Sequence, residues 1–484
     1  MKAESTKLHG AIMNNLVIDL THGGVKIAIS LAKEGKNVLA YDIYNTLGDV
    51  DRAMLEVYSV ELIDLNQLGE FHGDMKVISP VHLPLTHDEI RKYNPDLNYT
   101  FITHHEAVLE ILEGWGEGIP KIEITGVKGK TSSVFMLKEI LIDENPLILS
   151  SLGAILYDNN QERILKKNIS ITPANIKETI DLAYKVANPF CKITDGEIKN
   201  RNPPKYSSAI FESSLGVTGI GDVGLLTNIS ENYPIAKNRL TAAEAKRQVF
   251  RCGCAVINKE SLDEYYPDVN HPKTNTFSLD DKSANLYVEN VNYSLDETEI
   301  EIRYRDVKTI NDEIINGEIT VKTFAPGQHH VSNVLGVVLT SLALNIDKDK
   351  IINGLANYKG ITGRTNKRSK DGICIIEEIN PGINTDAIKQ SINMIGDIEN
   401  YYIAIGGDYG ITCEEIDEGK VSKYLDTLDC KIILTGDVGL SISKKMSGDA
   451  EYIPDYSDVY DKAIADSKNL LFIYRSDYRK VSLR

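Results

Sequence analysis

The sequence lacks the features that would place a chain in a membrane or on nucleic acid. It has no run of about 18 consecutive apolar residues, and no basic segment followed by an apolar one near its start. It also lacks positive charge, since its formal net charge is −17. Nucleic acid and anionic membranes both require a basic surface. We therefore expect a cytoplasmic protein that acts on small molecules.

Cysteine is scarce as well, with 6 residues in a chain of 484. Scattered cysteines in a cytosolic chain are typically reduced core residues rather than disulfides. The pair Cys252 and Cys254 could instead bind a metal, although no second Cys/His pair at ligand spacing lies nearby. The remaining cysteines, for which we expect the core role, are Cys191, Cys374, Cys413 and Cys430.

The most specific pattern lies between residues 121 and 141, where an apolar strand leads through a glycine loop into a helix. Gly126 and Gly129 allow backbone N–H groups to close around phosphate oxygens, and the helix offers its positive N-terminus. Lys130 would neutralise the β and γ phosphates, and Thr131 would supply a hydroxyl to Mg²⁺. The pattern predicts a site for a nucleoside triphosphate. The alternative is a chance strand–turn–helix with a surface lysine.

Other segments indicate three α/β domains, at 1–114, 115–359 and 360–484. Residues 14–41 predict a βαβ unit whose turn lacks the G-x-G-x-x-G pattern, so we expect substrate binding or a structural turn rather than NAD. Alternating strands and helices after residue 120 predict a mainly parallel sheet. The polar segment 270–325 is typical of antiparallel strands, inserted or appended. A new run of strands follows Arg364.

Further motifs follow the glycine loop in a fixed order: Glu212-Ser213-Ser214, Thr227-Asn228-Ile229, the lysine segment 245–250, the segment 327–333 with His330 and Asn333, Gly363-Arg364, Gly406-Gly407-Asp408 and Thr435-Gly436-Asp437. With the short G-x-x-G-K-T loop, this combination over about residues 115–484 resembles the Mur ligases, which include the folylpolyglutamate synthetases. The resemblance implies a three-domain α/β architecture: a central P-loop parallel sheet between Rossmann-like N- and C-terminal domains.

The resemblance also implies roles for individual residues. Glu212 would bind Mg²⁺ with Thr131, and Lys246 would be the carbamylated lysine that holds a second ion. The structural alternatives are that Glu212 forms an ion pair and that Lys246 is a solvated lysine on a helix. The implied catalytic residues are Lys130, Glu212, Lys246 and Arg364. The implied ATP contacts are Gly126, Gly129, Lys130, Thr131, Ser132, His330, Asn333, Arg364 and Asp408, with helix packing as the alternative for His330.

Departures from the family pattern bear on the reaction. Ser230 to Tyr233 replace the usual Asp-His pair after Thr-Asn-Ile, and Glu377 to Gly382 lack the histidine found at that strand end in many relatives. These segments and the opening Asp19 to Gly24 are most similar to those of methanogen members that act on a nickel tetrapyrrole. Such members use ATP to activate a propionate side chain and close it onto a ring carbon. The open alternatives are an amide ligase that adds an amino acid and a nucleotide-binding regulator without catalysis.

Overall fold

The computed structural model describes residues 13–187, 206–361, 364–395, 398–410, 416–477 and 481. By its contacts the chain divides into two compact units, which are described separately below. The first comprises Met1–Tyr287, Tyr304–Gly317 and Leu335–Ile351. The second comprises Val288–Arg303, Glu318–Val334 and Ile352–Arg484. The domain boundaries expected at 114/115 and 359/360 stay predictions.

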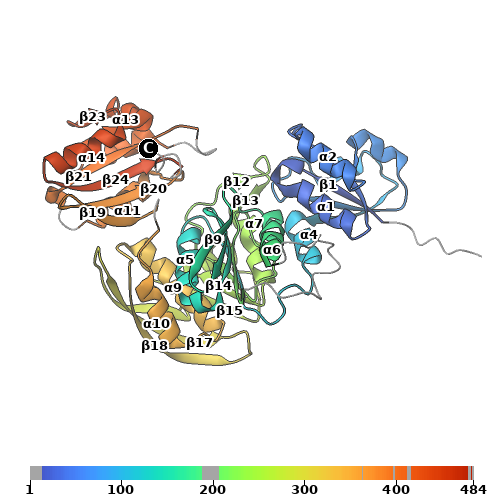
Figure 1. Cartoon of the computed structure of the whole chain (residues 1–484), viewed down its shortest axis with the longest axis horizontal. Helices are drawn as coiled ribbons and strands as arrows, with labels where there is room; N and C mark the ends of the chain where they lie inside the picture. The colour runs from blue at the N-terminus through green and yellow to red at the C-terminus, as the bar shows by residue number, and fades with distance from the viewer. Residues whose placement is uncertain are drawn as a thin grey trace, which may run out of the picture. The chain divides into compact units, whose positions relative to one another are not determined.

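The chain begins with a parallel sheet of five strands in the order β3-β2-β1-β4-β5 (Figure 1). Alternate residues of β1 serve two cores: Val17 packs with the helices α1 and α4, and Leu16 and Ile18 pack on the other face. The predicted βαβ unit is confirmed. The strands are β1 Asn14–Ile18, β2 Asn37–Tyr41, β3 Glu61–Leu62, β4 Asp74–Ser79 and β5 Asn98–Thr103, and the helices are α1 Val25–Lys33, α2 Asp49–Val57, α3 His87–Arg91 and α4 His104–Ile111.

The second sheet has eleven strands in the order β18-β17-β16-β15-β14-β11-β6-β10-β7-β8-β9. The strands from β15 to β7 are parallel, and the inner ones are mostly apolar and buried along their whole length, as expected of parallel strands covered on both faces. The strands before β16 are β6 Lys121–Thr125, β7 Leu147–Ser150, β8 Gly153–Asp158, β9 Gln161–Lys166, β10 Ala209–Glu212, β11 Val223–Leu226, β14 Cys254–Asn258 and β15 Thr274–Ser278.

At one edge of this sheet the structure corrects the expectation for the first part of residues 270–325, while the expected antiparallel pairing among β16, β17 and β18 stays a prediction. The strand β15 lies parallel to β14, and β16 lies parallel to β15 where Phe277 pairs with Leu286. Sequence alternation reports which face a residue occupies, but it does not report the direction of the neighbouring strand. The strands at this edge are β16 Leu286–Asn292, β17 Thr298–Lys308 and β18 Ile314–Thr323. At the other edge, β8 and β9 are antiparallel.

The helices that follow these strands include α5, which packs on β6 and β10, and α6, which packs on β7 and β9. The lysine segment lies at the junction of two short elements: α7 ends at Lys246 and a 3-10 turn continues to Arg251. Two short strands, β12 Pro234–Ile235 and β13 Leu240–Thr241, precede it. The helices are α5 Lys130–Ile140, α6 Pro173–Ala187, α7 Ala242–Lys246, α8 Lys259–Tyr265, α9 Gln328–Ala343 and α10 Lys348–Asn357.

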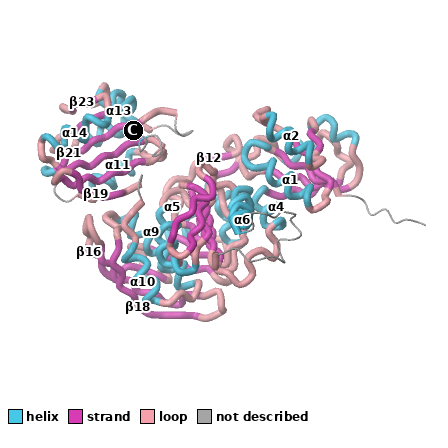
Figure 2. The backbone as a smooth tube through the Cα atoms, in the orientation of Figure 1, coloured by secondary structure: helices cyan, strands magenta, loops and turns pink. Residues whose placement is uncertain are grey.

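The last sheet has six strands in the order β19-β20-β24-β21-β22-β23, and Figure 2 shows them in magenta among the helices of the C-terminal part. Only β19 runs antiparallel to its neighbour. One face packs against α11, α12 and α13, and the other against α14. The predicted run of strands after Arg364 is confirmed, and the third domain at 360–484 stays a prediction. Its elements are β19 Asn366–Lys370, β20 Ile373–Ile379, α11 Thr385–Asn393, β21 Tyr401–Gly407, α12 Glu418–Leu425, β22 Ile432–Thr435, α13 Gly436–Ser443, β23 Glu451–Ile453, α14 Tyr456–Ala465 and β24 Asn469–Arg475.

Within the described ranges, no helix combines the length and apolarity needed to cross a bilayer. The cysteines in these ranges are free thiols, with Cys252 and Cys254 buried. Burial raises the pKa of both thiols, that of Cys254 to about 11, so they are protonated core residues rather than ready metal ligands. The other two free thiols are Cys374 and Cys430, while Cys191 and Cys413 lie outside the described residues.

Candidate active site

The glycine loop connects β6 to α5 in the shape expected of a phosphate loop. Gly126 has φ 143° and Gly129 has φ 85°, both in the left-handed region that favours glycine. A Cβ atom on Gly126 would lie 2.0 Å from the hydroxyl oxygen of Thr227. The Nζ of Lys130 donates to the carbonyls of Gly126 at 3.0 Å and Val127 at 3.3 Å. The lysine therefore lies over the loop, where a phosphate would meet it.

Two residues after β11 hold the loop in place. The Val127 N–H donates to the Asn228 carbonyl at 2.9 Å, and the Lys128 N–H donates to the Asn228 Oδ1 at 3.2 Å. The Thr227 hydroxyl donates to the Lys128 carbonyl at 2.6 Å. The Thr-Asn-Ile motif thus has a physical role that the sequence alone did not assign: it fixes the backbone of the phosphate loop against the neighbouring strand.

A buried carboxylate lies at the start of α5. Glu212 ends β10 and is 2% exposed. The hydroxyl of Thr131 lies 3.1 Å from both of its carboxylate oxygens, and the backbone N–H of Ser151 donates to it at 3.0 Å. The Thr131 and Ser151 hydroxyls are 3.0 Å apart. Hard oxygen donors of this kind suit Mg²⁺. Ser132, the next residue of α5, is half-buried.

Ser151 was missed by sequence reasoning. It directly follows β7, the strand that pairs with β10, so its place at a strand end beside the Glu212 strand was the available signal.

Lys246 lies in the interior and not on a solvated helix face. It is 0% exposed, and its Nζ donates to the Ser214 carbonyl at 2.5 Å. Burial, followed by repulsion from the Lys130 charge, holds the pKa of Lys246 well below its ordinary value. A capping box of Thr241 and Glu244 starts the short helix that carries it. The structure therefore excludes the solvated-lysine alternative and favours a neutral amine.

The segment that replaces the usual Asp-His pair supports this same helix. Asn232 accepts a bond from the Ala243 N–H at 2.9 Å, and the Ala242 N–H donates to the Tyr233 carbonyl at 2.9 Å. These residues fix the start of α7, so the departure from the family pattern has a structural consequence here.

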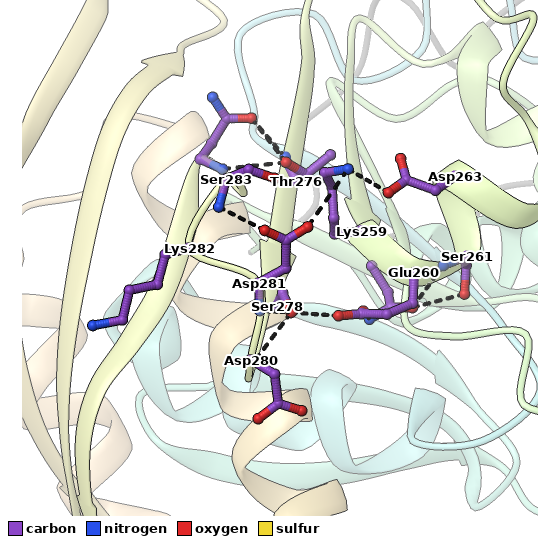
Figure 3. A network of polar contacts seen from close by, with 12 residues as sticks. Lys259, Glu260, Ser261, Asp263, Thr276, Ser278, Asp280, Asp281, Lys282 and Ser283 are labelled. Carbon is purple, nitrogen blue, oxygen red and sulfur yellow. Dashed lines mark hydrogen bonds and ion pairs between the residues drawn. The ribbon is translucent and has the colours of Figure 1, made fainter.

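A network of polar contacts joins the residues at the carboxyl ends of β14 and β15, as Figure 3 shows. The Ser278 hydroxyl bonds to the Glu260 carboxylate and accepts the Asp280 and Asp281 N–H groups at 3.1 and 2.9 Å. Ser261 in turn accepts the Ile229 N–H at 3.0 Å, which ties the network to the loop after β11. Through Ile229 this network adjoins Asn228, the residue that holds the phosphate loop.

The remaining predicted nucleotide contacts belong to the second unit. His330 and Asn333 are buried on α9, with 5% and 6% exposure. The Nε2 of His330 lies 2.9 Å from the Thr365 hydroxyl, which itself donates to Glu378. Burial, followed by the nearby His329, lowers the pKa of His330 well below its ordinary value. These bonds fit the helix-packing alternative for His330, while its contact with ATP stays a prediction; Thr365 had no signal in the sequence.

The other strand ends of this unit are also occupied by internal contacts. Asn380 donates to the Glu378 carboxylate at 2.7 Å. The carboxylate of Asp408 accepts bonds from the Ser476 hydroxyl at 2.7 Å and from the Tyr474 hydroxyl at 3.2 Å. Arg364 is partly exposed, and its N–H donates to the Ile361 carbonyl at 2.9 Å. The roles of these residues toward ATP stay predictions.

Comparison with known proteins agrees with this geometry. Residues 367–477 match the family described as coenzyme F430 synthetase CfbE, C-terminal domain. The coenzyme F(430) synthetase of Methanocaldococcus jannaschii is 28% identical over 452 residues, which cover 92% of this chain and 95% of the relative. That of Methanosarcina acetivorans is 26% identical over 462 residues, 91% and 93% of the two chains.

A crystal structure of MurF from Acinetobacter baumannii matches the fold with a TM-score of 0.54 and 12% identity, over 95% of this chain and 89% of that one. The chain therefore has the fold of the Mur ligases, which confirms the predicted α/β architecture. Similarity to curated ligases confirms the predicted ATP-dependent ligase class.

Proposed function

We propose that the chain is an ATP-dependent cyclo-ligase of the coenzyme F(430) synthetase type. In this reaction a carboxylate of a nickel seco-tetrapyrrole acid is activated as an acyl phosphate, and a carbon of the same molecule captures it. The observation that carries the ATP-dependent step is the contact between Thr131 of the phosphate loop and the buried Glu212. Two relatives of that name along nearly the whole chain support the choice of substrate.

The residues of the first unit account for the phosphoryl transfer. Lys130 would leave the loop carbonyls to meet the β and γ phosphates, where its charge offsets the charge that spreads over the transferring group. The loop backbone between Gly126 and Gly129 would hold the phosphates in line with the attacking carboxylate. Thr131 and Glu212 would hold Mg²⁺, which supplies charge neutralisation and a fixed phosphate geometry when bound.

Lys246 would contribute as a carbamate. A neutral buried amine can add CO₂, and the carbamate so formed is an anion able to hold a second Mg²⁺. The low pKa of Lys246 and its position within the field of Lys130 support the neutral form that this modification requires. Ser132, His330, Asn333, Arg364 and Asp408 are proposed as the contacts that complete ATP binding.

The second step would need no amino acid. The acyl phosphate loses phosphate to an internal carbon nucleophile, a proton leaves that carbon, and the net change in the tetrapyrrole is the loss of one water. The replacement of the usual strand-end histidine by Glu378 and Asn380, which bond to each other, is consistent with the absence of a site for a separate amine. A cytoplasmic location suits such a coenzyme ligase.

The decisive experiment is an incubation of the full chain with ATP, Mg²⁺ and the nickel seco-tetrapyrrole acid. We expect ADP, phosphate and a product lighter by about 18 Da, the mass of the water lost when an acyl phosphate is captured internally. A parallel reaction supplies a panel of amino acids. A product heavier by an amino-acid residue would establish the amide ligase instead, and absence of ATP turnover with both substrates would indicate a regulator.

A further inference from the structure

A second polar cluster lies in the first sheet, away from the phosphate loop. Asp19 directly follows β1, and His82 lies in the loop after β4. In the order β3-β2-β1-β4-β5 the connections reverse direction between these two neighbouring strands. The carboxyl ends of parallel strands at such a switch point form the crevice in which open α/β sheets bind ligands. The cluster therefore occupies the place where this sheet is built to hold one.

Three potential ligand atoms converge there. The Asp19 Oδ2 lies 2.7 Å from the Nδ1 of His22 and 3.4 Å from the Nε2 of His82. All three donors lie within 4.8 Å of one another, and they form the only such His/Cys/Asp/Glu group among the described residues. The Asp19 side chain is fully buried, whereas those of His22 and His82 are 45% and 26% exposed. The cluster is thus anchored by a buried carboxylate, and its two imidazoles are partly exposed to solvent.

The backbone holds Asp19 in a strained position. Its φ is 71°, which is uncommon for a residue other than glycine and which clusters at functional sites. Its Oδ1 accepts the N–H groups of Thr21 at 3.0 Å and His22 at 3.2 Å, so only Oδ2 faces the imidazoles. A Cβ on Gly24 would lie 2.2 Å from the Asp19 carbonyl oxygen. The turn is therefore built around this one carboxylate.

The loops that carry His22 and His82 are also held by contacts with other segments. Gly23, with φ 107°, lies so close to the central segment that an added Cβ would be 2.6 Å from the Cβ of Ala174. Arg239 donates to the carbonyl of Leu83, next to His82, at 2.7 Å. Donors that are fixed before a ligand arrives lose little freedom when it binds.

We propose that Asp19, His22 and His82 bind one divalent transition metal ion of the nickel and zinc class. Two imidazoles and one carboxylate suit such ions, whereas Mg²⁺ prefers oxygen donors throughout. The solvent-facing side would leave coordination positions for a carboxylate of an incoming small molecule. This site lies outside the ATP machinery, and its existence does not depend on the proposed reaction.

The same imidazoles could instead bind the central metal of a tetrapyrrole. A macrocycle already occupies four positions of its metal and leaves one axial position on each face. Three converging protein donors exceed what that geometry can use. The structure therefore favours a separate ion over a metal held in a ring.

The test is a titration of the metal-stripped full chain with Co²⁺, without ATP or Mg²⁺. We expect one equivalent to bind with visible d–d bands, and Ni²⁺ to displace it. His82→Ala and His22→Ala should each weaken binding by at least about 10-fold, in line with the loss of a ligand. His87→Ala is the matched control, because His87 lies in the same domain, stacks on Phe101 at 4.0 Å and stands outside the cluster. Circular dichroism verifies the fold of each variant.

Absence of Co²⁺ and Ni²⁺ binding, or equal binding by the wild type and both histidine variants, would overturn the site. A second arm uses a water-soluble nickel tetrapyrrole carboxylate as the probe. If its visible bands shift on binding, lose that shift in His22→Ala, and the free ions do not bind, the separate ion is wrong and axial ligation takes its place. Neither readout involves turnover, so failure of the proposed reaction leaves both results interpretable.

Discussion

The sheet of β1 to β5 and the central sheet each place a candidate site at the carboxyl ends of their strands, but the two sites are built from different residues. In both, the strands that carry the candidate site are parallel, and polar residues gather at the carboxyl ends of adjacent strands, β1 with β4 and β6 with β10. After β6, two glycines with positive φ bring backbone donors and Lys130 together. After β1, the positive φ belongs to Asp19, whose carboxylate faces two imidazoles.

The difference shows that topology locates a site, while a few loop residues select its ligand. A glycine loop followed by a lysine and a threonine presents N–H groups, a charge and a hydroxyl, which suit phosphate and Mg²⁺. A loop of one acid and two histidines presents an oxygen and two nitrogens, which suit a softer metal. Each prediction below tests one side of this contrast, beginning with the largest effect.

Lys130→Ala should abolish ATP-dependent turnover, with a loss of about 10³-fold or more, because it removes a charge that would stabilise the transferring phosphoryl group. The measurement is ADP release under saturating ATP. Lys138→Ala, two turns further along the same helix and paired with Glu139, serves as the control and should remain active. Wild-type turnover in Lys130→Ala would remove the loop from the mechanism.

Glu212→Gln should cut turnover by about 10–100-fold and raise the Mg²⁺ concentration needed for half activity, because an amide is a weaker ligand of a hard cation. Activity is measured across a Mg²⁺ titration. Glu144→Gln, at an exposed ion pair with Lys350, should behave like the wild type. Superimposable titration curves for Glu212→Gln and the wild type would refute the metal role.

Gly126→Ala should weaken ATP binding by about 10-fold or more, because a clash with Thr227 is added to a strained φ, and such strain costs roughly 1–3 kcal/mol. Equilibrium binding of ATP is the measurement. Gly118→Ala is the matched control, because Gly118 also has a positive φ, 82°, but no atom lies within 4 Å of the added Cβ. Equal ATP affinity in both variants would mean that the loop tolerates the displacement.

Lys246→Met should change the pH dependence of stability. The native pKa of Lys246 is lowered by burial, so the unfolded chain binds more protons, and stability of the wild type rises with pH toward the ordinary lysine value of 10.5. The thermal midpoint of Lys246→Met relative to the wild type should therefore fall by a few degrees between pH 7 and pH 9.5. Lys185→Met, at an exposed position on α6, should show a constant difference. A constant difference for Lys246→Met would contradict the buried neutral amine.

The strands and the phosphate loop could be predicted because local pattern determines them. Segments such as residues 209–211 and Tyr401–Gly407 consist of apolar residues and glycine, and they are buried on both faces. Gly126, Gly129 and Lys130 identify their loop because few other structures need that order of residues. In these cases the information lies within about ten residues of chain.

Contacts between distant segments could not be predicted in the same way. Thr131 and Glu212 are 81 positions apart, and His330 and Thr365 are 35 apart, so only the folded chain brings them together. Lys246 resembled a surface residue because its segment alternates small and charged residues. Its burial depends on packing around Ser214, which no local propensity encodes.

The antiparallel edge of the central sheet has a consequence for the behaviour of the protein at high concentration. The strand β9 is last in the sheet order, so its outer N–H and C=O groups could pair with a strand of another molecule. Its exposed residues are Gln161, Glu162, Arg163 and Ile164, and Lys166 follows. Charges on such an edge oppose sheet extension between molecules. The apolar Ile164 and Leu165 lie between Arg163 and Lys166, so the charged residues of this short strand oppose aggregation through its open edge.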